Sequence, residues 1–146
     1  MRRIISNTSC LIALSNIGRL EILHELYGTV VITPEVRSEF GEALPDWISV
    51  NSVSDPSKTK LIQHTLDLGE SSTIALAMES EDPLLILDDK KARQFSKSIG
   101  LTLTGTLGVI VKAKQSGFIA EDIATIVSEF RQRGFRIPFG IEEELP

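Results

Sequence analysis

Short apolar runs alternate along the chain with longer stretches in which apolar residues recur every three or four positions. The runs are rich in aliphatic and β-branched residues, which predicts strands. They lie at residues 3–6, 29–33, 84–87 and 101–104, and a weakly alternating segment at 47–53 is typical of an edge strand. Strands that alternate with helices pair in parallel and carry helices on both faces. The pattern therefore predicts an α/β protein, a three-layer α/β/α sandwich with a central parallel sheet.

The longer stretches carry the end signals of helices. They lie at residues 7–18, 20–26, 34–40, 60–69, 70–80, 90–100, 106–117 and 120–134, the two central ones joined near Gly69. Pro34 stands at a first helical position, where its missing N–H is no loss. The stretch 54–60, with Pro56 as its breaker, predicts a loop. A length of 146 residues suits one core, so we expect a single domain over residues 1–146.

Composition mainly excludes classes of protein. Fifteen basic and twenty acidic residues give a net charge of −5, so any contact with nucleic acid must be local or depend on a metal. The single cysteine, Cys10, cannot form an internal disulfide. The two histidines, His24 and His64, lie far apart in the sequence, so the spacing of zinc ligands is absent. Because the chain shows no signal-peptide pattern and no apolar run near the length of a membrane span, we expect a cytoplasmic protein with no membrane contact.

Polar residues follow the predicted strands. In open parallel sheets, ligands bind outside the carboxyl ends of the strands. The residues at these ends, or on the helix that follows, are Asn7, Glu39, Asp88, Asp89, Thr104 and Thr106. Carboxylates from several strand ends suit a hard cation such as Mg²⁺ or Mn²⁺, which prefers oxygen ligands. We therefore expect a divalent-ion site at one rim of the sheet, with Asp88, Asp89 and Glu39 converging on it.

The carboxylates also have simpler interpretations. Asp88 and Asp89 precede a helix, where one can cap the first turn and the other can favour its positive end. Glu39 can pair with Arg37 or remain solvated. Glu70 stands at a helix start, where the dipole favours a carboxylate without any ligand.

Two further residues near these strand ends carry an ambiguous signal. Arg93 lies one turn after Asp89, so it can pair with that carboxylate or hold a phosphate. Free N–H groups around Thr106 can bind an anion, although ordinary helix capping explains them equally well.

Several longer segments resemble a known family. They are SNTSCLIALSNIGRLEIL, VVITPEVRSEF, LDLGESSTIALAMES, PLLILDDKKARQFSKSIGLTLTGTLGVIVKAKQSG and GFRIP. In this order, and over nearly the whole chain, they resemble the PIN-like family DUF3368 of small prokaryotic proteins. That family is similar to the PIN-domain nucleases, which include VapC-type toxins that cut RNA with Mg²⁺ or Mn²⁺ and often lie beside a small antitoxin-like partner.

The resemblance assigns roles to individual residues. It places Asn7 at the first PIN carboxylate, Glu39 at the second and Asp89 at the third, with Asp88 adjacent. It implies that these four hold the metal, that Glu39 and Asp89 are catalytic, and that Ser9 orients the first ligand. Active PIN nucleases have Asp where this chain has Asn7.

Active PIN nucleases also commonly have an acidic residue near the position where this chain has Thr106. We therefore expect Thr106 to be a substrate-binding or supporting residue of the site, and Arg93, which can hold a phosphate, to be another.

Three functional hypotheses follow. The first is a PIN-like, metal-dependent ribonuclease, in one form the toxin of a toxin–antitoxin pair. The second is a degenerate PIN module that binds RNA or a protein partner without cutting. A phosphoacceptor receiver domain is disfavoured, because receivers need an acidic pair after the first strand and a Lys after the last, where this chain has Asn7 and residues 104–106.

The C-terminal segment predicts an interface. Phe130, Phe135, Ile137 and Phe139 lie in a tail that is short for internal burial. Because exposed apolar clusters usually mark contact surfaces, we expect a homodimer or an antitoxin peptide to cover them.

Overall fold

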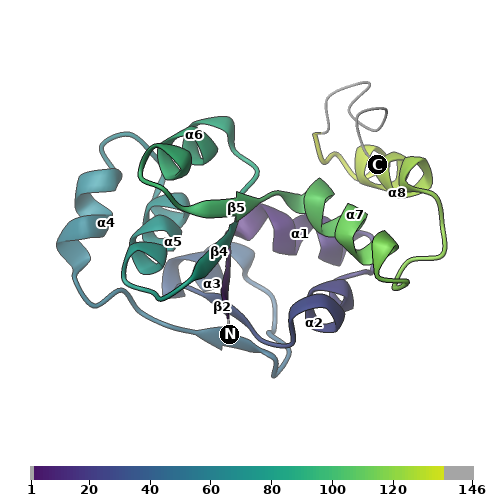
Figure 1. Ribbon diagram of the computed structural model, residues 1–146, viewed down its shortest axis with the longest axis horizontal. Helices are drawn as coiled ribbons and strands as arrows, with labels where there is room; N and C mark the ends of the chain where they lie inside the picture. The colour runs from purple at the N-terminus through teal and green to yellow at the C-terminus, as the bar shows by residue number, and fades with distance from the viewer. Residues whose placement is uncertain (1, 137–146) are drawn as a thin grey trace.

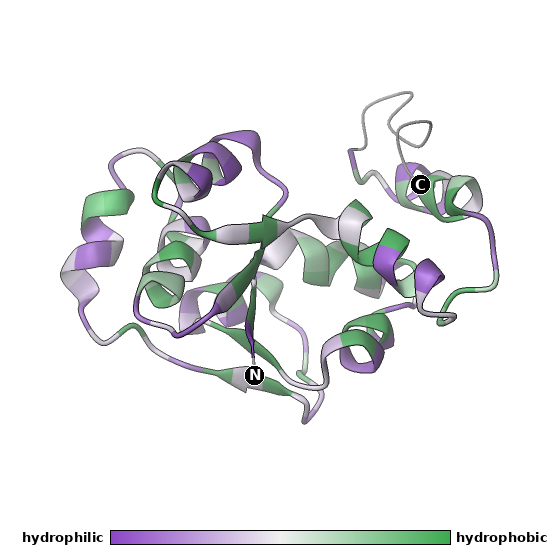
Figure 2. Cartoon of the chain, viewed as in Figure 1, coloured by the Kyte–Doolittle hydropathy of each residue, from purple (hydrophilic) through white to green (hydrophobic). Residues whose placement is uncertain are grey.

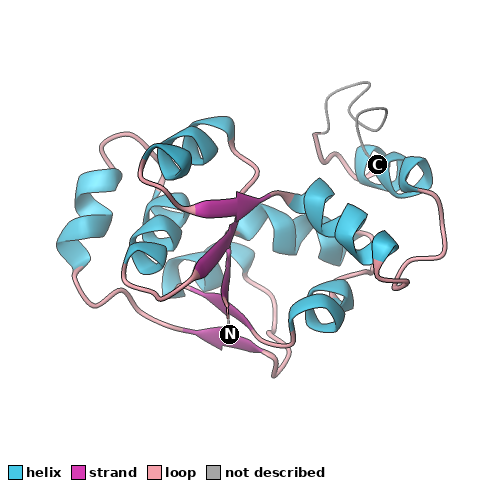
Figure 3. Ribbon diagram, viewed as in Figure 1, coloured by secondary structure: helices cyan, strands magenta, loops and turns pink. Residues whose placement is uncertain are grey.

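The computed structural model describes residues 2–136, which form a five-stranded sheet with helices on both faces (Figures 1 and 3). All four strand pairs are parallel, and the strand order is β3-β2-β1-β4-β5. The strands are β1 (Arg3–Ser6), β2 (Val30–Ile32), β3 (Ile48–Val50), β4 (Pro83–Ile86) and β5 (Thr102–Thr104). The predicted α/β/α sandwich is confirmed, and β3 is an edge strand as expected.

Eight helices occur within the described part of the chain. They are α1 (Thr8–Asn16), α2 (Glu21–Tyr27), α3 (Pro34–Phe40), α4 (Pro56–Ile62), α5 (Leu68–Met78), α6 (Lys90–Ser98), α7 (Thr106–Gln115) and α8 (Ile123–Gln132). Thr33 caps α3 by accepting a hydrogen bond from the N–H of Val36, and Pro34 opens that helix as predicted.

Each inner strand contributes to two cores, because successive side chains on a strand face opposite sides of the sheet. Ile4 of β1 belongs to the core shared with α1, α2, α3, α7 and α8, whereas Ile5 belongs to the core shared with α4, α5 and α6. The same alternation separates Leu84 from Leu85 on β4. Figure 2 shows the hydrophobic colour on the central strands and a largely hydrophilic α6. Burial on both faces explains why the strands read as continuous apolar runs.

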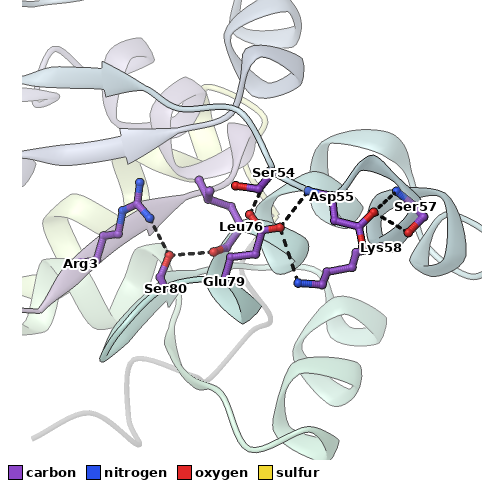
Figure 4. Close-up of polar contacts among 8 residues, drawn as sticks. All are labelled: Arg3, Ser54, Asp55, Ser57, Lys58, Leu76, Glu79 and Ser80. Carbon is purple, nitrogen blue, oxygen red and sulfur yellow. Dashed lines mark hydrogen bonds and ion pairs between the residues drawn. The ribbon is translucent and has the colours of Figure 1, made fainter.

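The prediction of a loop at residues 54–60 was wrong, because α4 begins at Pro56. Pro56 occupies the first helical position, and Asp55 caps the helix by accepting a hydrogen bond from the N–H of Ser57 at 3.0 Å. The carboxylate of Glu79, at the end of α5, accepts hydrogen bonds from the N–H groups of Ser54 (2.8 Å) and Asp55 (3.0 Å), as Figure 4 shows. The hydrogen bond from Ser54 is the main cause of a lowered pKa at Glu79. A distant carboxylate thus completes the start of this helix.

The predicted helix 60–69 was also wrong in its extent. The structure has α4 ending at Ile62 and α5 beginning at Leu68, with Asp67 as the cap of α5. Asp67 accepts a hydrogen bond from the N–H of Glu70 at 2.9 Å. The second helix therefore begins two residues before the predicted start at residue 70.

The strand order reverses beside β1. The chain runs from β1 to β2 and β3 on one side, and then places β4 and β5 on the other. Ser6 is paired with Ile86, and the N–H of Asn7 donates to the carbonyl of Ile86 at 3.0 Å. The carboxyl ends of β1 and β4 therefore lie side by side at a topological switch point, where open α/β sheets bind ligands.

The C-terminal aromatic residues correct the predicted interface. Phe130 is fully buried in the core, and Phe135 packs on it with ring centroids 5.2 Å apart. These two rings complete the core around α8, so they do not form an exposed cluster. Ile137 and Phe139 lie outside the described residues. No helix among residues 2–136 is long and apolar enough to cross a membrane.

Candidate metal centre

A cleft of about 720 Å³ opens at the carboxyl ends of β1 and β4. Its lining consists of Asn7, Thr8, Ser9, Ile12, Glu39, Asp67, Glu70, Asp88, Asp89, Lys90, Phe135 and Arg136. All four predicted ligands are in this set, as is Ser9. The other two predicted site residues, Arg93 and Thr106, do not line the cleft. They lie behind it and contact the turn between β4 and α6.

Asn7 lies at the junction of β1 and α1. Its backbone is extended, its side chain makes no capping hydrogen bond, and the residue is only 5% exposed. Its Oδ1 is buried and has no hydrogen-bond partner among the described residues. A buried acceptor without a partner costs about 1 to 3 kcal/mol. Asn7 is thus a residue of the cleft lining whose side-chain oxygen is buried and unpartnered.

Asp88 ties three elements together. Its Oδ1 accepts from the N–H of Thr106 at 2.8 Å, and its Oδ2 accepts from the hydroxyls of Thr106 (2.5 Å) and Ser9 (3.2 Å). The end of β4 is thereby joined to the first turns of α1 and α7. Burial, followed by the negative charge of Asp88, strongly raises the pKa of the nearby Cys10 thiol. Both oxygens of Asp88 are already engaged, unlike that of Asn7.

Asp89 caps α6, as the simpler interpretation predicts. Its Oδ2 accepts from the N–H of Ala92 at 3.0 Å, while within residues 2–136 no hydrogen bond to Oδ1 is found. Arg93 is not paired with Asp89 in the described part of the chain; its guanidinium donates to the carbonyl of Leu87 at 2.7 Å. Arg93 thus supports the turn that carries both carboxylates.

Glu39 reaches the cleft from α3. Its Oε1 accepts a hydrogen bond from the hydroxyl of Thr8 at 2.5 Å, and no ion pair with Arg37 occurs among the described residues. The carboxylate lies directly against the start of α5, where a Cβ added to Gly69 would fall 2.1 Å from Oε1. A glycine at this position therefore leaves room for Glu39.

Glu70 is a cleft residue to which the sequence argument gave only a helix-start role. It is 8% exposed on α5. Burial, and then the charges of Asp67 and Asp89, raise its pKa to about 7. The spacing of Asp67 and Glu70 is that of a capping box, and the apolar run that follows was the available signal that this helix is buried. Glu70 joins Glu39 and Asp89 as a carboxylate of the cleft.

Comparison with known proteins decides the family. The family described as DUF3368: PIN domain matches residues 3–145. The chain belongs to this family of PIN domains. No curated protein and no solved structure has a significant match to the chain. This match confirms the resemblance to DUF3368 drawn from the sequence. PIN domains are generally dependent on divalent metal, and the family suggests a nuclease-like function and nucleic-acid binding.

The donor set of this PIN domain suits a hard divalent cation. Among residues 2–136, five carboxylates but only two cationic side chains, Lys90 and Arg136, line the cleft, and the unpartnered Oδ1 of Asn7 is a further oxygen donor. Within residues 2–136, however, no group of three or more His, Cys, Asp or Glu side chains is arranged to hold a metal. The carboxylates therefore line one cleft without meeting at a common point, so a cation would have to draw them together or bind them through water.

Proposed function

We propose that this PIN domain is a divalent-metal-dependent ribonuclease. The observation that carries the proposal is the buried, unpartnered Oδ1 of Asn7 in a cleft that also contains Glu39, Glu70 and Asp89. An orphaned acceptor among carboxylates is a destabilising arrangement unless a cation offsets it. Mg²⁺ or Mn²⁺ fits the oxygen-only donor set.

The residues of the chain divide between holding and supporting roles. Asn7, Glu39, Asp89 and Glu70 line the cleft and would hold the ion, Asn7 through its unpartnered Oδ1. Asp88 is fully hydrogen-bonded, so it would contribute mainly negative charge and the position of the β4 turn.

Among the supporting residues, Ser9 and Thr106 hold Asp88, and Arg93 holds the turn from behind. The bound ion would supply Lewis-acid polarisation of a phosphodiester and activation of water.

A second candidate function has its own support. Asn7 brings no formal charge, and no three carboxylates in the described part of the chain meet at one point. Both observations favour a PIN module that binds RNA or a protein partner without cutting. Metal-dependent cleavage separates the two candidates.

The test uses four proteins: the parent, Asn7→Asp, Asp89→Asn and the double variant. Restoring a carboxylate at residue 7 should tighten Mn²⁺ binding in calorimetric titration and raise cleavage of labelled RNA. Asp89→Asn keeps a capping side chain but removes a charge, so it should abolish both gains. If Asn7→Asp bound Mn²⁺ no better than the parent, the cleft would not be a metal site. RNA binding without cleavage would then support the second candidate.

We further propose a cytoplasmic toxin of a toxin–antitoxin pair, with RNA as substrate and a small antitoxin protein or a second copy of the chain as partner. Expression should arrest growth, and coexpression of the antitoxin should relieve the arrest. Light scattering at high protein concentration tests the homodimer. A monomer in that measurement, together with normal growth on expression, would contradict this part of the proposal.

A further inference from the structure

A smaller pocket of about 200 Å³ adjoins the carboxylate cleft, between α1 and the turn after α8. Its lining is Ser9, Ile12, Ala13, Asn16, Arg133, Gly134 and Phe135. Ser9, Ile12 and Phe135 also line the large cleft, so the two cavities are neighbours that share these side chains. A ligand that crosses the carboxylates can therefore place one group in the smaller pocket.

The smaller pocket combines apolar surface with unused polar groups. Phe135 is held in place by Phe130, and Ile12 is 41% exposed on α1. Asn16 and Arg133 are exposed, and neither side chain has a hydrogen bond or ion pair to another described residue. An aromatic ring, an amide and a guanidinium are the groups that stack on an unpaired nucleobase and hydrogen-bond to its edges.

The charges around the pocket favour a nucleotide as its occupant over an apolar peptide. Lys90 and Arg136 line the cleft next to five carboxylates, yet neither forms an ion pair within the described part of the chain. Together with Arg133 they provide three cationic groups that a phosphate backbone could contact. Lys90 comes from the start of α6 and Arg136 from the segment after α8, so these contacts would lie on different elements.

We propose that the smaller pocket is a base-binding subsite, which holds one unpaired nucleobase of an RNA strand whose backbone crosses the carboxylate cleft. This inference rests on the proposed function and adds a position-specific contact to it. Phe135 and Ile12 provide the stacking surface. Asn16 and Arg133 read the base edge, which gives a nucleotide preference at one position beside the cleavage point.

The experiment measures binding of a labelled single-stranded RNA by fluorescence anisotropy, in EDTA and low salt so that no cleavage occurs. The same RNA is then tested with a single abasic site moved along it. At one position the abasic site should weaken binding to the parent by about 5- to 150-fold, the range of one base stacked on one aromatic ring. Phe135→Ala should cause a similar loss and make binding insensitive to that abasic site, whereas Phe135→Trp should retain both.

Asn16→Ala and Arg133→Gln change exposed side chains and keep the test valid if Phe135→Ala unfolds. Both should change which nucleotide is preferred at the sensitive position. Lys91→Gln is the matched control for loss of charge, because Lys91 is exposed and lines neither cavity. If RNA bound the parent but no position responded to Phe135 or Asn16, the subsite would be refuted while the proposed function stood. If RNA bound the parent neither in EDTA nor with Mn²⁺ present, the proposed function itself would fail.

Discussion

Glu70 gives the most direct test of the electrostatics of the cleft. Burial and the charges of Asp67 and Asp89 raise its pKa from 4.5 to about 7. Between these pH values the folded chain keeps a proton that the unfolded chain has released, so the free energy of unfolding falls as pH rises. The loss of stability caused by ionising the buried Glu70 is absent below pH 4.5 and complete above pH 7. The difference corresponds to about 3 kcal/mol at most, and because the cleft is open to water we expect about 1 to 2 kcal/mol.

Glu70→Gln removes this ionisation and keeps the shape of the side chain. Without metal, the variant should be more stable than the parent by about 1 to 2 kcal/mol at pH 8 and equally stable at pH 4. Urea unfolding at pH 4, 6 and 8 measures the difference, and Glu25→Gln on the exposed surface of α2 is the matched control. If the difference in free energy of unfolding between Glu70→Gln and the parent were the same at every pH, the charge of Glu70 would not be its cause. A less stable variant at pH 8 would refute the reasoning.

Three other substitutions test contacts around the cleft and α4. Thr106→Val removes the hydroxyl that donates to Asp88, and we expect a loss of about 1.5 to 3 kcal/mol in urea unfolding. Gly69→Ala should keep or raise the melting temperature, since Ala favours helix, yet weaken Mn²⁺ binding in calorimetry because the new Cβ displaces Glu39. Glu79→Gln should lower the melting temperature at pH 7, and the difference from the parent should shrink as the pH falls below 4.5. The lowered pKa of Glu79 means that its stabilisation exists above pH 4.5 and is lost as pH falls through the folded value.

The sheet was predictable because each inner strand is buried on both faces and therefore reads as an apolar run. The start of α4 was not, because its local sequence contains a Pro that breaks one helix and opens another equally well. Asp55 caps the helix locally, and the carboxylate of Glu79, at the end of α5, also accepts hydrogen bonds from the N–H groups of Ser54 and Asp55. Such a contact depends on how two helices pack, and no local pattern records it.

The candidate site was predictable to the extent that it follows from strand ends. Asn7 and the Asp88–Asp89 pair follow directly from the ends of β1 and β4. Glu39 lies further along, on the helix after β2, so its position relative to the strand end was a weaker signal, which the family resemblance strengthened. The role of Glu70 depends on the burial of α5 against the sheet, since the same carboxylate on an exposed helix would merely favour the dipole. The sequence also could not show that both carboxylate oxygens of Asp88 accept hydrogen bonds from Ser9 and Thr106.

The neutral side chain at residue 7 is consistent with the crowding of charge in this cleft. Among the described residues, five carboxylates already share it with two cationic side chains, and Asn7→Asp would add a sixth carboxylate at the junction of β1 and β4. Without metal, Asn7→Asp should therefore lower the free energy of unfolding through like-charge repulsion. Mn²⁺ should restore it, by about 2.7 kcal/mol when the ion is present at a hundred times its dissociation constant. Urea unfolding with and without Mn²⁺ measures both effects, and Asn51→Asp, at the partly buried end of β3, is the control for a new carboxylate outside the cleft. If Mn²⁺ stabilised Asn7→Asp no more than it stabilised the control, the oxygen of residue 7 would not be a metal ligand.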